Sequence, residues 1–86
     1  MEATPDDVEV DEVQAAFEKV ENVVDVHDLH IWALTQGKNT LTCHVKYRAD
    51  NLDTQLTVLN ALDKISREKF GIHHITVQCE PEQRAL

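Results

Sequence analysis

The residues of this chain that are best suited to chemistry are its histidines, which gather in three short segments. They are His27, His30, His44, His73 and His74. Two thiols and a carboxylate lie beside them, at Cys43, Cys79 and Glu80. Imidazole nitrogen, thiolate sulfur and carboxylate oxygen are the ligands that zinc prefers in proteins. Any one histidine is more often a hydrogen-bonded structural residue than a ligand, but five in a chain of 86 residues predict a metal site.

The segments that carry the histidines have the pattern of β-strands. Residues 23–34 are rich in β-branched and large apolar residues that alternate with polar ones, and residues 40–47 alternate again. The polar stretch at 36–39 separates them, so the two segments predict a hairpin. Residues 73–80, which Pro81 follows, predict a third strand.

Two helices are expected around these strands. The first begins at Asp11, with Asp11 as N-cap and Gln14 as its capping-box partner, and ends near Asn22. The second is capped by Asp50 and Asn51 and ends at Gly71, where a helix needs a left-handed residue. Its expected apolar stripe consists of Leu52, Leu56, Leu59, Leu62 and Ile65.

The order of these elements predicts an α+β fold, a ferredoxin-like αββαβ arrangement that lacks the usual first strand. We expect a three-stranded mixed sheet with both helices on one face. Residues 1–10 are predicted to be a linker, residues 11–81 the domain and residues 82–86 a flexible tail. The uncovered sheet face favours pairing with a second copy of the chain, since a two-fold dimer is the commonest closed assembly.

Strand alternation separates the candidate ligands. His27 is expected on one face of the first strand, and His30 and Trp32 on the other, with Trp32 as a core anchor. His44 and Glu80 each face away from their neighbouring cysteines, which we expect to be small buried residues. His27, His44 and Glu80 could therefore share a face, with His73 at the mouth of the third strand.

The register of the hairpin decides whether this site can form. If Gly37 and Lys38 formed a two-residue turn, His44 would pair with Ile31. His27 would then lie on the order of 13 Å further along the strand. A metal site at His27 and His44 therefore requires a β-bulge or a wider loop, and bulges are common beside functional sites.

Composition argues against a nucleic-acid-binding protein, a membrane-spanning segment and an enzyme. A formal net charge of -8 repels the phosphate backbone of nucleic acids and anionic membrane surfaces. Two cysteines and the lack of a leader pattern indicate a reducing cytosol, and no apolar run approaches the roughly twenty residues of a membrane span. An enzyme is not expected, because no catalytic motif is present. In a zinc hydrolase, His27, His44 and Glu80 could be the metal ligands, with Asp28 or Glu82 as acid or base.

Three blocks of sequence closely resemble the C-terminal domain of cation diffusion facilitator zinc transporters. They are Val26–Thr35, Leu41–Val45 and Phe70–Glu80, which follow in the right order and spacing. The resemblance implies a homodimeric domain at the cytosolic face of a membrane. It would bind zinc or related divalent ions and stabilise or activate proton-coupled export by a membrane domain of the same transporter.

The resemblance also implies a set of metal ligands. They are His27, His44, His73 and Glu80. Some family members add a Cys-x-x-Cys tail, which residues 82–86 lack, so Cys79 and His74 are the candidates for a second position. The alternative is a stand-alone interaction or metal-delivery module of ferredoxin-like shape, in which the histidines are mainly structural.

Overall fold

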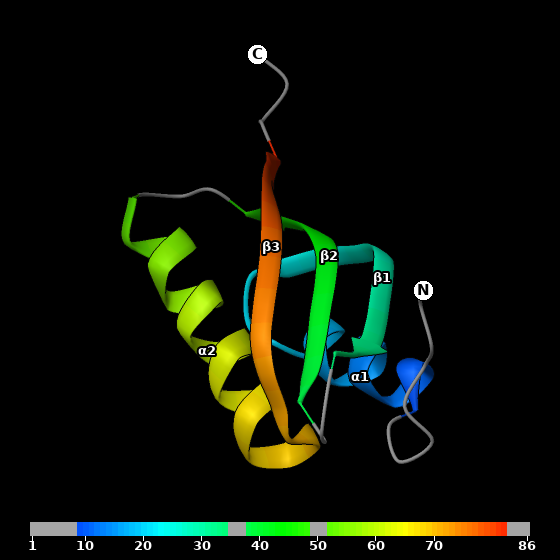
Figure 1. The fold of residues 1–86 in the computed structure, drawn as a ribbon. Coiled ribbons are helices and arrows are strands. Elements are labelled where there is room, and N and C mark those ends of the chain that lie inside the picture. Colours follow the sequence, from blue (N-terminus) through cyan, green and yellow to red (C-terminus); the bar gives the residue numbers. More distant parts are fainter. Residues whose placement is uncertain (1–8, 35–37, 49–51, 83–86) are drawn as a thin grey trace.

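A three-stranded sheet with β2 between β1 and β3 is the centre of the fold (Figure 1). The computed structural model describes residues 9–34, 38–48 and 52–82. In chain order the elements are α1 (Val10–Glu18), β1 (Val23–Ala33), β2 (Asn39–Arg48), α2 (Leu52–Phe70) and β3 (Ile72–Glu82). The expected αββαβ order is confirmed.

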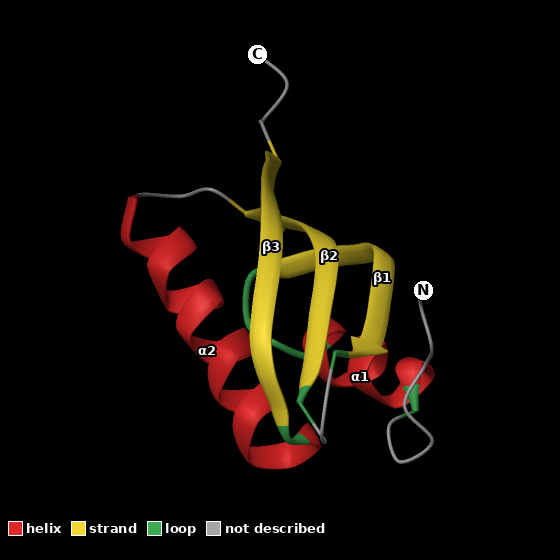
Figure 2. Ribbon diagram, in the orientation of Figure 1, coloured by secondary structure: helices red, strands yellow, loops and turns green. Residues whose placement is uncertain are grey.

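The sheet is mixed, as expected. β1 and β2 form an antiparallel hairpin, whereas β2 and β3 run parallel and are joined through α2. Both helices pack on the same face of the sheet, and the other face is open (Figure 2). None of the helices in the described ranges is long and apolar enough to cross a membrane.

The core lies between the helices and one sheet face. It consists of Val13, Phe17, Val26, Ile31, Leu41, Cys43, Val45, Tyr47, Val58, Leu62 and Ile72. Two expectations about it are wrong. Trp32 does not belong to the core and is only half-buried, and Leu56 on α2 is 61% exposed. The stripe of α2 that faces the sheet instead runs through Thr54, Val58, Leu62 and Ser66, one residue per turn.

The small hydroxyl residues of this stripe explain the difference. Ser66 is fully buried because its hydroxyl donates to the Leu62 carbonyl of the preceding turn at 2.8 Å. Its small side chain lies on the sheet-facing side of α2, whereas the larger Leu56 lies off that stripe and is exposed. A pattern that counts only large apolar residues misses such a contact.

The start of α1 and the end of β3 differ from expectation. Glu9, not Asp11, is the N-cap of α1 and makes no side-chain cap, while Gln14 donates to the Val26 carbonyl at 3.1 Å instead of completing a capping box. β3 continues through Pro81 to Glu82, which an edge strand tolerates because a proline nitrogen can point away from the sheet. The proposed cap at 50–51 lies outside the described residues.

Gly71 ends α2 as expected. Its φ of 64° is left-handed, which costs glycine nothing and reverses the chain directly into β3. The domain boundaries expected from sequence stay predictions, because residues 1–8 and 83–86 lie outside the described residues.

Candidate metal centre

A β-bulge in β1 builds the candidate site. Thr42 pairs with His30, and His44 pairs with His27, so Asp28 and Leu29 together oppose Cys43. Asp28 has a φ of 51°, in the left-handed region that aspartate tolerates better than most residues. The extra residue brings His27 directly opposite His44.

The connection between β1 and β2 also shifts their register, relative to a hairpin with a two-residue turn. The paired ladder closes at Ala33 and Asn39, and the Leu34 amide donates to the Lys38 carbonyl at 2.9 Å. Without the bulge, this register would place Asp28 opposite His44. The site required a wider loop or a bulge, and both are present.

The bulge also reverses the alternation of side chains in β1. Because His30 pairs with Thr42, which lies two residues from His44 on β2, His30 occupies the open face together with His44. Trp32, paired with Thr40, lies on that face as well. The expectation that His30 and Trp32 face away from His27 is wrong, because strict alternation holds only in a regular strand.

Three strands bring His27, His44 and Glu80 together on the open face. The two imidazole rings, from β1 and β2, have centroids 5.1 Å apart and an interplanar angle of 43°. Glu80 from β3 spans them: its Oε2 accepts from His44 Nδ1 at 2.6 Å, and its Oε1 lies 3.4 Å from His27 Nε2. The side chains are 39%, 33% and 29% exposed, so an ion could reach them from solvent.

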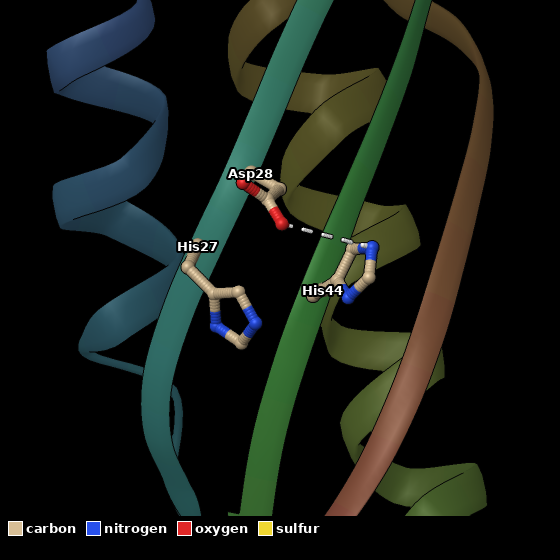
Figure 3. Close-up of side chains that lie close together, drawn as sticks. All are labelled: His27, Asp28 and His44. Atoms are coloured by element: carbon tan, nitrogen blue, oxygen red, sulfur yellow. Dashed lines mark ion pairs between the residues drawn. The ribbon is translucent and has the colours of Figure 1, made fainter.

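Asp28 joins the same cluster from the bulge (Figure 3). Its Oδ2 lies 4.0 Å from His44 Nε2, and one ligand atom from each of His27, Asp28 and His44 lies within 4.8 Å of the others. Two ligands of one zinc ion are about 3.3–4.2 Å apart when each bond is near 2.1 Å. Small side-chain movements would therefore let these residues bind one cation.

Sequence reasoning missed Asp28 as a candidate ligand. Regular alternation turns its carboxylate away from His27, and only the bulge returns it. The surface beside it is hollowed into an open depression of about 390 Å³, whose lining includes Asp28, His30 and His44. Nε2 of His44 lies on the Asp28 side of the ring, and Nδ1 lies on the Glu80 side.

The left-handed backbone of Asp28 gives a test of the bulge. Asp28→Val should lower the free energy of unfolding by about 1–2 kcal/mol, because a β-branched side chain is strained at positive φ. Asp28→Gly should not lower it, yet should weaken zinc binding. Denaturant unfolding and calorimetry measure the two effects. Gln78→Val on the regular part of β3 is the matched control; equal losses in both valine variants would contradict this role of the bulge.

His73 is not brought to this cluster. It lies near the start of β3, seven residues before Glu80, which places the two side chains roughly 23 Å apart along the strand. One chain therefore assembles three of the four expected ligands. The role of His73 as a ligand stays a prediction, and it would require other partners, such as residues of a second copy.

The two cysteines lie on the opposite, helix-covered face. Cys43 pairs with Val77, and Cys79 pairs with Val45, so their thiols point away from His44, and both are free. Burial, together with the nearby Cys79, raises the pKa of the Cys43 thiol from 9.0 to about 12, and burial raises the pKa of Cys79 as well. They behave as small apolar residues, as expected.

The raised pKa of Cys43 predicts its reactivity. At pH 8 a thiol-specific reagent should label Cys43 only on unfolding, because the thiolate is the nucleophile and the residue is buried. Since the folded pKa lies above the unfolded one, the folded state should hold its stability below pH 9 and lose it between pH 9 and about 12. Labelling of Cys43 in the native protein as fast as in urea would be the contrary result.

Fold and site together define an α+β domain whose open sheet face carries histidines and carboxylates suited to a divalent cation. A family model described as the cytoplasmic domain of cation efflux proteins matches residues 5–82. The chain belongs to this family.

Curated relatives agree with this assignment. The cadmium, cobalt and zinc/H(+)-K(+) antiporter of Bacillus subtilis (strain 168) is 40% identical over 87 residues, covering 95% of this chain and 26% of the antiporter. The metal cation efflux system protein CzcD of Cupriavidus metallidurans is 41% identical over 80 residues, covering 93% of this chain and 25% of CzcD. The chain thus spans about a quarter of the length of these relatives.

Solved structures show the same fold. The metal-bound C-terminal domain of the CzcD transporter matches with a TM-score of 0.77 at 40% identity, covering 85% of this chain and 99% of that one. The zinc form of CzrB matches with a TM-score of 0.69 over the whole of both chains, at 21% identity, which is a likeness of fold alone.

Proposed function

We propose that this chain is the cytosolic regulatory domain of a divalent-cation exporter and that it binds zinc through His27, His44, Glu80 and Asp28. The observation that carries the proposal is the convergence of one carboxylate of β3 on two imidazoles from β1 and β2. Family membership supplies the context, since the family is a domain of cation efflux proteins.

The chemistry of the ligand set supports a divalent transition metal. Two imidazole nitrogens and two carboxylates give a mixed nitrogen and oxygen set of the kind that suits zinc and several of its neighbours. Two formal negative charges from Glu80 and Asp28 offset those of a divalent ion. The thiols face the other side of the sheet, so we expect no preference for soft monovalent ions. The name of the Bacillus subtilis relative, with cadmium, cobalt and zinc, agrees with such a range.

We also propose that two copies pair through the open face of the sheet. This face carries the candidate metal site, and neither helix of its own chain covers it. A cation bound near the seam would favour one arrangement of the copies in proportion to its tighter binding in that arrangement. In a full-length transporter, that preference would act on the membrane domain and so on proton-coupled export.

Calorimetric titration with zinc, followed by analytical ultracentrifugation, tests the proposal. We expect saturable binding, reversed by a chelator, and a dimer that zinc strengthens. Thr76→Arg, in the middle of the open face, should weaken the dimer, whereas Asn60→Arg on the exposed side of α2 should not. Heat changes no larger than those of dilution would exclude the metal-binding form of the proposal.

The other two functions make different predictions. A stand-alone module with structural histidines would dimerise or dock without binding zinc. A zinc hydrolase would hydrolyse an activated ester, and a chelator would remove that activity. We expect no chelator-sensitive hydrolysis, because the family is a transporter domain.

A further inference from the structure

We propose that Asp25 is a positioning residue of the metal centre, whose carboxylate holds His27 in the tautomer that leaves Nε2 free for a cation. His27 Nδ1 donates to Asp25 Oδ2 at 3.1 Å, while His27 Nε2 faces the cluster, 3.4 Å from Glu80 Oε1. The inference rests on the proposed function, because His27 is a ligand only in that proposal. Asp25 would bind the other ring nitrogen of His27 and would not itself bind the ion.

Local structure places Asp25 for this task. It lies two residues before His27 on β1, so the two side chains project from the same face of the strand. The β1–β2 register shifts just before Asp25 and again just after His27, and the pair occupies the regular stretch between the two irregularities. Within that stretch the alternation is strict, which fixes the carboxylate beside the ring.

Asp25 contacts the imidazole of His27, although a lysine lies opposite it on the neighbouring strand. Lys46 lies opposite Asp25 in the β1–β2 register and opposite Glu80 in the β2–β3 register. Asp25 and Glu80 nevertheless contact the imidazoles, at 3.1 Å and 2.6 Å. Both carboxylates are therefore directed at the histidines, one at the outer edge of His27 and one between the rings.

The hydrogen bond matters because a neutral imidazole has one N–H and one lone pair. The hydrogen bond made by one nitrogen decides which nitrogen offers its lone pair to a metal. A carboxylate in this position also raises the basicity of the ligand and fixes the plane of the ring. Asp25 thus selects Nε2 of His27 before the ion arrives, and the affinity gains from a ring that needs no reorientation.

Histidine nitrogen-15 NMR of the metal-free chain reads the tautomer directly. The spectra are recorded about two pH units above the ordinary histidine pKa of about 6.5, where imidazoles are neutral. We expect His27 to be the Nδ1–H form in the wild type and to shift towards the Nε2–H form in Asp25→Ala. Asp25→Asn should keep the wild-type form, because the amide oxygen still accepts a hydrogen bond.

Zinc calorimetry on the same proteins gives the second readout. Asp25→Ala should weaken binding about tenfold, the lower end of the 10–100-fold effect of outer-sphere partners, because Asp25 is 54% exposed. Asp25→Asn should lose less. Glu21→Gln, which removes one exposed charge before β1, is the charge-matched control and should bind as the wild type does. Adding Lys46→Gln to Asp25→Ala should not restore affinity if the effect is positional.

Several outcomes would overturn the inference. They are an unchanged tautomer in Asp25→Ala, equal losses in Asp25→Ala and Glu21→Gln, and full recovery of affinity on adding Lys46→Gln, which would reduce Asp25 to a diffuse negative charge. If the wild type itself failed to bind zinc, the proposed function would fall, while the tautomer measurement would still decide whether Asp25 orients His27.

Discussion

His44→Ala is expected to weaken zinc binding by more than the roughly 10–100-fold that the loss of an outer-sphere partner costs. His44 lies between the two carboxylates, with Nδ1 at 2.6 Å from Glu80 and Nε2 at 4.0 Å from Asp28. Removing its ring takes away a ligand and leaves both carboxylates without the group that orients them. Calorimetric titration of the variant with zinc measures the loss.

The fold should survive this change. The His44 side chain is one-third exposed and lies on the face opposite the core, so far-ultraviolet circular dichroism should match that of the wild type. His73→Ala is the matched control, since it removes a histidine at the other end of β3. Zinc affinity that falls equally in both variants would contradict a site centred on His44 and would point to His73 as a member of the same centre.

His30→Ala tests whether zinc affinity depends on membership of the cluster or only on closeness to His27 in the sequence. His30 belongs to the same short segment as His27 and, because of the bulge, shares its face. It contributes to the hollow beside Asp28 but does not belong to the cluster of His27, Asp28 and His44. Its loss should therefore reduce zinc affinity much less than the loss of His44.

The elements of this fold were predictable because each has a local signal. Alternation identified the three strands, and Gly71 marked the end of α2 where its φ is indeed positive. The convergence of His27, His44 and Glu80 was also expected, but only on condition of an irregular hairpin. Nothing local specifies that irregularity: an aspartate tolerates the left-handed backbone of a bulge, yet most aspartates in strands do not adopt it.

One extra residue then changed every later assignment in β1. Placing Asp28 in the bulge moved His30 and Trp32 to the open face, so both were misplaced by a rule that holds for regular strands. The same limit applies to α2, where packing against the sheet selected Thr54 and Ser66 over the exposed Leu56. Contacts between distant segments decide such choices, and a pattern within one segment cannot contain them.

Zinc at about 100 times its dissociation constant is expected to raise the midpoint of thermal unfolding by about 10–20 °C. Binding to the folded state alone adds about 2.7 kcal/mol at that concentration, and one kcal/mol shifts the midpoint of a domain this small by about 4–8 °C. The proposed ligands come from β1, β2 and β3, so an unfolded chain cannot present them together. The core is thin, with eleven buried apolar residues in its main cluster among the residues that the structure describes, and the added free energy is a large part of the total. Differential scanning calorimetry with zinc, and again after a chelator, measures the shift. His44→Ala should abolish it while His73→Ala keeps it, because only a cation held across the three strands ties its binding to the folding of the whole sheet.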